Sequence, residues 1–305
     1  MSKRLVVITC ALALMLNPST GFAATVSPSV LELSSTPGTV LTSSFTVFNT
    51  GASDQVYFLD LLAFESGDED GTPVFAPEKT EINAFLSWIE FPLSDVRVPA
   101  QSKVDVPFTV AVPDDISAGS YYGAITISTA PSEIVANNGA IVEAKTAVLV
   151  FLTIEGETQE HLELLDFSIS QDDVSLPFGT FEYRVQNQGN VYLTPTGEIT
   201  LMGLFGQRIA RIEANASEGR VLPSTTRMFT AQLIDSDRIW IQAAGYQLRH
   251  LLIGPVTAEL SLNFGNNQLI TSNLTYWVMP WQLLALMLGL ALILIWFTKK
   301  LHDKR

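Results

Sequence analysis

The chain has 305 residues, of which 47% are hydrophobic and only 16% are charged, and its formal net charge is -14. Such a composition excludes an intrinsically disordered chain. The acidic excess argues against nucleic-acid binding, because neutralising phosphates requires clustered Lys and Arg. One cysteine and three histidines leave little material for a zinc site or a redox centre. The length predicts about two domains.

The first 23 residues have the layout of a secretory signal peptide. Lys3 and Arg4 precede the apolar run 5–16, and a polar break and small residues follow. The run is shorter than the roughly 20 residues that span a membrane, so we expect cleavage after Ala23. A buried N-terminal helix and an uncleaved signal are the alternatives. Cleavage would remove the sole cysteine, Cys10, and the mature chain would form no disulfide.

Residues 24–277 consist of short alternating runs separated by clusters of Gly, Pro, Asn and Ser. Apolar side chains occupy every second position over 104–112 and again over 256–264, with shorter versions at 45–47, 125–127 and 181–185. A period of two predicts strands with one buried face. The clusters of turn-forming residues between these runs favour antiparallel sheets over βαβ units. We therefore predict an all-β protein with two tandem immunoglobulin-like antiparallel β-sandwiches, followed by one C-terminal transmembrane α-helix.

An internal repeat supports two domains of similar topology. The turn Asn49-Thr50-Gly51 corresponds to Asn187-Gln188-Gly189, because Asn and Gly suit the left-handed conformations of such turns. A proline then precedes a strand in each half (Pro99 and Pro223), and a glycine opens the next strand (Gly119 and Gly254). Three landmarks in the same order predict domains at 24–155 and 156–277.

The first half contains an acidic loop over residues 65–71. Asp68 and Asp70 are candidate ligands for calcium, a hard cation that prefers oxygen ligands. The complete calcium-loop pattern, with its bidentate Glu at the twelfth position, is absent. A solvated hairpin tip is the alternative. Calcium is the one cofactor that the sequence suggests.

The second half contains an insertion over residues 235–252. Trp240, Ala244, Leu248 and Leu251 have helical spacing, which predicts a short amphipathic helix. Insertions on a rigid sandwich commonly carry binding residues, so Trp240 and Leu248 are candidate partner-binding residues. A helix that only covers the sandwich is the alternative.

The C-terminal region has the pattern of a membrane anchor. Residues 278–298 are almost entirely apolar, with Gln282 as the one strongly polar side chain, and a basic tail follows at 299–305. This length matches the hydrocarbon core of a bilayer, and the basic tail predicts a cytoplasmic C-terminus. We expect a single-pass membrane protein with an extracytoplasmic ectodomain. The alternative is a buried core helix.

These features together resemble the WxL-interacting proteins of bacterial cell surfaces. The resemblance covers the whole predicted mature chain, and its residues are Phe45-Thr46-Val47-Phe48-Asn49, residues 112–123, Gln188-Gly189-Asn190-Val191 and Val221-Leu222-Pro223. It implies a first domain that binds peptidoglycan and a second that binds WxL-type surface proteins or host ligands. No binding residues are carried over from the family. The first domain has few cations, which argues against direct contact with anionic wall polymers.

No catalytic motif is found: Gly-x-Ser-x-Gly, His-Glu-x-x-His, the phosphate loop and the dinucleotide fingerprint are all absent. The sequence cannot place a glycosidase-type carboxylate pair, and we expect a protein that is not an enzyme. The leading hypothesis is a membrane-anchored binding or scaffold protein of the cell surface.

Two alternatives to a scaffold remain open. The first is an assembly chaperone like those of pili, although residues 26–33 carry Glu32 and no cation that would anchor a subunit carboxylate. The second is a sensor, which would need a membrane partner because its tail is short.

Overall fold

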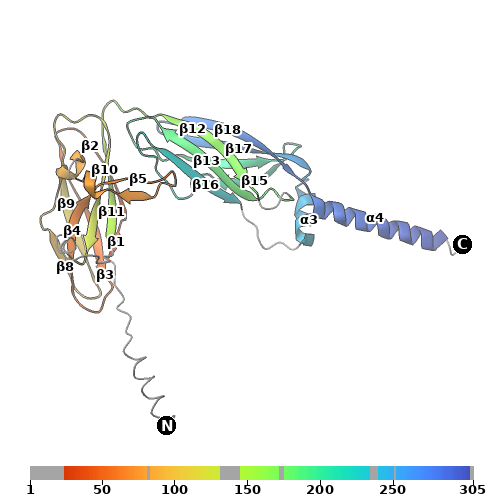
Figure 1. Ribbon diagram of the computed structural model, residues 1–305, viewed down its shortest axis with the longest axis horizontal. Coiled ribbons are helices and arrows are strands. Elements are labelled where there is room, and N and C mark those ends of the chain that lie inside the picture. The colour runs from red at the N-terminus through yellow and green to blue at the C-terminus, as the bar shows by residue number, and fades with distance from the viewer. Residues whose placement is uncertain are drawn as a thin grey trace, which may run out of the picture. The chain divides into compact units, whose positions relative to one another are not determined.

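A computed structural model describes residues 24–80, 83–130, 145–171, 175–233, 240–250 and 252–302. The predicted signal peptide with Cys10 lies outside these ranges. The described chain is mainly β-strand and has one long apolar helix near its C-terminus, as predicted (Figure 1). It divides into two compact units. The first comprises the chain up to Phe64 together with Phe75–Ile116 and Tyr121–Ile154, and the second comprises Glu65–Val74, Ser117–Ser120 and the chain from Glu155 onward.

The first unit has two main sheets. One has the order β1-β3-β9-β7, with bounds Thr25–Ser27, Val40–Asn49, Ser102–Ala111 and Ile89–Glu90. The other has the order β2-β11-β10-β4-β8, with bounds Val30–Ser35, Thr146–Ile154, Gly119–Ser128, Gln55–Leu62 and Asp95–Val98. Their inward side chains form one core, in which Phe45 and Phe108 of one sheet meet Ile125 and Leu152 of the other.

Short elements complete the first half of the chain. The 3-10 helix η1 spans Pro77–Lys79, and η2 spans Ala84–Trp88. The side chain of Asn83 caps η2 by accepting from the N–H of Phe85 at 3.2 Å. Phe85 and Trp88 of η2 are buried in the same core. The remaining pair, β5 (Phe64–Ser66) and β6 (Pro73–Phe75), forms a two-stranded hairpin.

The prediction of purely antiparallel sheets is wrong at one position. The described chain begins with two short strands in different sheets. Strand β1 pairs antiparallel with β3, whereas β2 pairs in parallel with β11. The chain crosses from one sheet to the other between β1 and β2, so β2 arrives at β11 in the parallel direction. Alternating side chains predict which face is buried but not the partner of a strand, so this pairing could not be predicted from the pattern.

The second unit also consists of two sheets around one core. The first has the order β12-β13-β16, with bounds Leu162–Ser170, Gly179–Asn187 and Thr226–Leu233. The second has the order β15-β14-β17-β18, with bounds Arg208–Glu213, Thr196–Met202, Gly254–Phe264 and Gln268–Val278. The alternating apolar positions of β17 are buried against Phe181 and Tyr183 of β13, as their period predicts.

The repeated Asn turns have the same structure in both units. Asn49 is buried, and its amide donates to the carbonyl oxygens of Val98 (3.0 Å) and Pro99 (3.1 Å), while its oxygen accepts from the N–H of Gly51. Asn187 is likewise buried and donates to the carbonyl of Val221 at 3.0 Å, and the N–H of Gly189 donates to it. A buried amide thus ties each turn to the chain that leads into the next strand.

Two helices belong to the second unit. Helix α3 spans Trp240–Arg249, which confirms the predicted helix, and α4 spans Trp281–His302. The predicted apolar face of α3 is not one buried face, because Ala244 is buried and Leu248 is exposed. The predicted start of the membrane helix at residue 278 is wrong, because Val278 is the last residue of β18 and is buried in the core. Pro280 directly precedes the helix, and its carbonyl accepts from the N–H of Leu284 at 3.0 Å.

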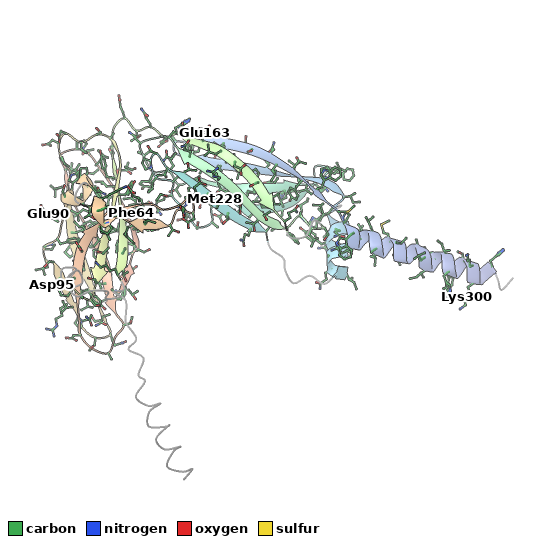
Figure 2. The ribbon with its side chains drawn as sticks, in the orientation of Figure 1. Phe64, Glu90, Asp95, Glu163, Met228 and Lys300 are labelled. Carbon is green, nitrogen blue, oxygen red and sulfur yellow. The ribbon has the colours of Figure 1, made fainter. Side chains whose placement is uncertain are left out.

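Within the described residues, one segment, Trp281–Lys300, is long and apolar enough to cross a membrane. Its 20 residues match the thickness of a bilayer core. Figure 2 places Lys300 near the end of α4 that lies away from the sandwich. Lys299 and His302 are in the last turn of the same helix, so the basic tail predicted from residue 299 begins as helix.

Candidate functional site

The acidic loop is held on the second unit by its own charged side chain. Glu69 accepts two hydrogen bonds from the guanidinium of Arg184 on β13, one of them from Nε at 2.5 Å. The main-chain carbonyl of Glu69 also accepts from the N–H of Met228 on β16. These contacts hold the loop against the sheet, and the pairing with Arg184 keeps the pKa of Glu69 below its ordinary value.

Asp70 is engaged inside the loop. Its carboxylate accepts from the main-chain N–H of Thr72 at 2.8 Å and from the Thr72 hydroxyl at 2.9 Å. These two hydrogen bonds lower the pKa of Asp70, and the nearby Arg227 guanidinium adds to the effect. The loop therefore has the hydrogen bonds of a structured turn, and Gly71 takes the left-handed conformation that such a turn requires (φ +75°).

The calcium hypothesis for Asp68 and Asp70 stays a prediction. Both side chains are exposed, but Asp70 already accepts two hydrogen bonds from Thr72, and its neighbour Glu69 is paired with an arginine. Over the described ranges, no group of three or more His, Cys, Asp or Glu side chains is arranged to hold a metal ion. A calcium ion at this loop would have to compete with Arg184 and Arg227 for the carboxylates.

The longest edge strand of the second unit is β18. It pairs with β17 over Gly254–Phe264 and Gln268–Val278, and the sheet order gives it no strand neighbour on its other side among the described strands. Edge strands commonly carry charges or proline that prevent pairing with another chain, and β18 contains neither. The edge strands β12, β15 and β16 all contain charged residues. Strand β18 is therefore the edge of the second unit best suited to accept an added strand.

A buried polar network joins α3 to the first turn of α4. The side-chain amide of Gln247, with no exposed surface, donates to the carbonyl of Ser175 (3.0 Å) and to Oε1 of Gln282 (2.6 Å). Gln282 in turn donates to the hydroxyl of Ser175 at 2.8 Å, and the N–H of Leu283 donates to Oε1 of Gln247 at 3.0 Å. The network satisfies polar groups that would otherwise be costly to bury, and it fixes the start of α4 against the sandwich.

Of the two predicted binding residues of α3, the structure describes the side chain of Leu248 but not that of Trp240. Leu248 is exposed, as a partner-binding residue must be, whereas Ala244 of the same predicted face is buried. Trp240 begins the helix, but its side chain lies outside the described part of the structure, as does Leu251. The buried face of α3 consists of Ala243, Ala244 and Gln247. Gln247 was missed from the sequence, although the isolated Gln282 in an apolar run was a signal that a polar partner existed.

No model of a known protein family matches this chain, and a comparison with curated proteins finds no match. Among solved structures, the class 5 fimbriae chaperone CfaA is 11% identical, with a TM-score of 0.40 and coverage of 84% of this chain and 99% of that one. The CupB2 chaperone of Pseudomonas aeruginosa is 10% identical, with a TM-score of 0.38 and coverage of 82% and 98%. A structure of the Salmonella enterica SafA pilin with the SafB chaperone matches at 10% identity, with a TM-score of 0.37 and coverage of 84% and 97%. Similarity this low does not transfer a function to this chain.

Proposed function

We propose that this chain is a non-catalytic, membrane-anchored extracytoplasmic protein whose two immunoglobulin-like units bind another protein and hold it at the membrane surface. The C-terminal helix α4 serves as the anchor, with the sandwiches outside the cytoplasm and the basic end inside. The partner docks by adding a strand to the edge of β18.

The uncharged edge of β18 is the observation that carries this proposal. A strand of eleven residues without charge or proline offers a row of main-chain donors and acceptors to an incoming chain. Strand addition gives affinity through main-chain hydrogen bonds and specificity through alternate side chains. Thr271, Asn273 and Thr275 are exposed along β18, so the side chains beside the edge are polar and uncharged.

The test is capture of partners by the full chain in its native membrane, with chemical crosslinking before detergent extraction. The variant Thr271→Lys places a charge beside the β18 edge, and we expect it to lose the partner. Its matched control is Thr230→Lys, which makes the same change at an exposed position of β16 in the other sheet. Equal capture by both variants would exclude the β18 edge. No crosslinked protein with any version of the chain would refute the binding function.

The anchor is tested separately by washing membranes with alkaline carbonate. A chain held by α4 stays in the membrane pellet, whereas a peripheral protein is released into the supernatant. Release of the unmodified chain into the supernatant would refute membrane anchoring by α4. It would leave a soluble periplasmic protein, which is how the pilus-type chaperone alternative would behave.

The scaffold and the chaperone differ in how long they keep the partner. The chaperones named above include one solved with its pilin, and a chaperone role for this chain would mean transient association with newly made subunits. Pulse labelling followed by capture separates the two functions, because a scaffold retains labelled partner throughout the chase and a chaperone loses it. The WxL-type partner and peptidoglycan stay predictions of the sequence resemblance. Sedimentation of the full chain with purified sacculi tests the second of them.

A further inference from the structure

One end of the second unit carries large apolar side chains that are exposed to solvent. They come from the β14–β15 turn, from α3, from the residue before β17, and from the junction of β18 with α4. We call this set the apolar end; its members are Leu204, Phe205, Ile241, Leu248, Ile253, Trp277, Met279 and Trp281. Phe205 is 71% exposed and Trp277 is 72% exposed. Single exposed apolar side chains are ordinary, but a contiguous set marks an interaction surface.

Printed contacts bring these elements to the same end of the unit. The side chain of Gln207, in the β14–β15 turn, donates to the carbonyl of His250 just after α3, at 2.8 Å. Strand β17 begins at Gly254, which is paired with Val278 at the end of β18. Helix α3 is joined to the first turn of α4 through Gln247. Figure 1 shows α3 beside the start of α4 at this end of the sheets.

The stretch of sequence from α3 through the apolar part of α4 carries few charges, in a chain with a net charge of -14. Between residues 240 and 298, the one acidic side chain is Glu259 and the one Lys or Arg is Arg249. Glu259 lies five residues into β17, which at about 3.3 Å per residue places it about 16 Å from the start of that strand. Glu259 is therefore well separated from the start of β17, where the apolar end lies.

We propose that the apolar end lies within the interfacial layer of the bilayer that α4 crosses, so that the second unit rests on the lipid surface. The proposal rests on the proposed function, because it needs α4 as the anchor. Trp277 and Trp281 stand where the chain passes from β18 to the membrane helix, which is the level at which tryptophans partition. Helix α3 supplies Ile241 and Leu248, seven residues apart and so on the same face. An amphipathic helix at this position immerses its apolar face in the headgroup region.

Lipid, and not another protein, covers the apolar end because this surface continues directly into the membrane helix α4. Only Met279 and Pro280 separate the last residue of β18 from the first residue of α4. The Gln247–Gln282 network prevents the helix from swinging away from α3. Because the start of α4 is fixed against the sandwich, the side chains beside it lie at the depth at which α4 enters the bilayer.

The experiment measures membrane depth at single labelled positions of the full chain reconstituted in phospholipid vesicles. Four variants, each in a chain carrying Cys10→Ser, are labelled with an environment-sensitive fluorophore: Phe205→Cys, Leu248→Cys, Leu269→Cys and Leu290→Cys. Leu269 is the matched control. It is 59% exposed and apolar, but it lies at the opposite end of β18 from Trp277. Leu290, in the middle of α4, reports on the anchor. Each label is challenged with a nitroxide-bearing lipid and with aqueous iodide.

The labels at positions 205 and 248 should show blue-shifted emission, quenching by the nitroxide lipid and protection from iodide, and the label at 269 should show none of these. Quenching by lipid at 290 together with free access of iodide to 205 and 248 would overturn the proposal while leaving the anchor intact. Protection from iodide at 205 and 248 without quenching by lipid would also overturn it, because a protein would then cover the surface. Absence of lipid quenching at 290 would refute the anchor, and this proposal with it.

Discussion

Replacing Gln247 by Leu removes the centre of the network that joins α3 to α4. The wild-type side chain donates to Ser175 and Gln282 and accepts from the N–H of Leu283. Leucine is close to glutamine in size but makes none of these hydrogen bonds. Three buried polar groups, on Ser175, Gln282 and Leu283, then lose a partner without gaining access to water. The variant therefore isolates the hydrogen bonding of the network from its packing.

The magnitude follows from the number of hydrogen bonds lost. A buried hydrogen bond contributes about 0.5–1.5 kcal/mol to stability, so three lost bonds lower the free energy of unfolding by about 3 kcal/mol. In a domain of this size, 1 kcal/mol corresponds to a shift of about 2–4 °C in the unfolding midpoint. We expect the midpoint of the second unit to fall by about 6–12 °C.

The assay is thermal unfolding of the full chain in lipid nanodiscs, followed by the near-ultraviolet circular dichroism of the buried aromatic side chains. The control is Gln232→Leu, which makes the same chemical change at an exposed position of β16 in the same unit, and its midpoint should stay close to that of the wild type. A Gln247→Leu midpoint within about 1 °C of the control corresponds to less than about 0.5 kcal/mol. That result would refute the view that the network stabilises the junction.

Four further variants test other parts of the structure. Glu69→Gln should flatten the acid dependence of stability: the lowered pKa of Glu69 means that its pairing with Arg184 stabilises the fold above the ordinary value of 4.5 and is lost as pH falls through the lowered value. Urea unfolding at a series of pH values measures this, and identical pH profiles for the two chains would contradict it. Asn187→Ala removes the buried turn amide and should lower the free energy of unfolding by about 2–4 kcal/mol in urea; a loss below about 0.5 kcal/mol would contradict this. Gly197→Ala should prevent folding of the second unit, because a Cβ atom there would stand 1.9 Å from the carbonyl oxygen of Ser261, and native-like circular dichroism would contradict it. Gly245→Ala, at a helical position with no atom within 4 Å of the new Cβ, should raise stability by about 0.5–1 kcal/mol, and a lower midpoint would count against the helix there.

The sequence was sufficient to predict the strands, because their signal is local. Alternation over 104–112 and 256–264 identified β9 and β17. The paired Asn turns were also recognisable, and Asn49 and Asn187 prove to be buried amides with equivalent hydrogen bonds. The start of α4 was predicted too early because the end of β18 and the start of the helix are both apolar. Hydropathy alone does not distinguish a buried strand residue such as Val278 from a lipid-facing one.

Features that depend on distant pairs were not predictable. Glu69 and Arg184 are 115 residues apart in the sequence, so the acidic loop looked like a solvated turn or a cation site rather than a segment with a specific arginine partner. The parallel pairing of β2 with β11 is non-local for the same reason. Exposure of Phe205 could not be read from residue type, because large apolar side chains are most often buried.

The direct connection of β18 to α4 has a mechanical consequence. Tension applied between a bound partner and the membrane passes from α4 into a strand of the core itself, with only two residues between them. The eleven residues of β18 are paired with β17 along the whole ladder, so the load is carried by a strand of the sheet and not by a flexible linker. The anchor is thereby suited to resist pulling on whatever the protein holds.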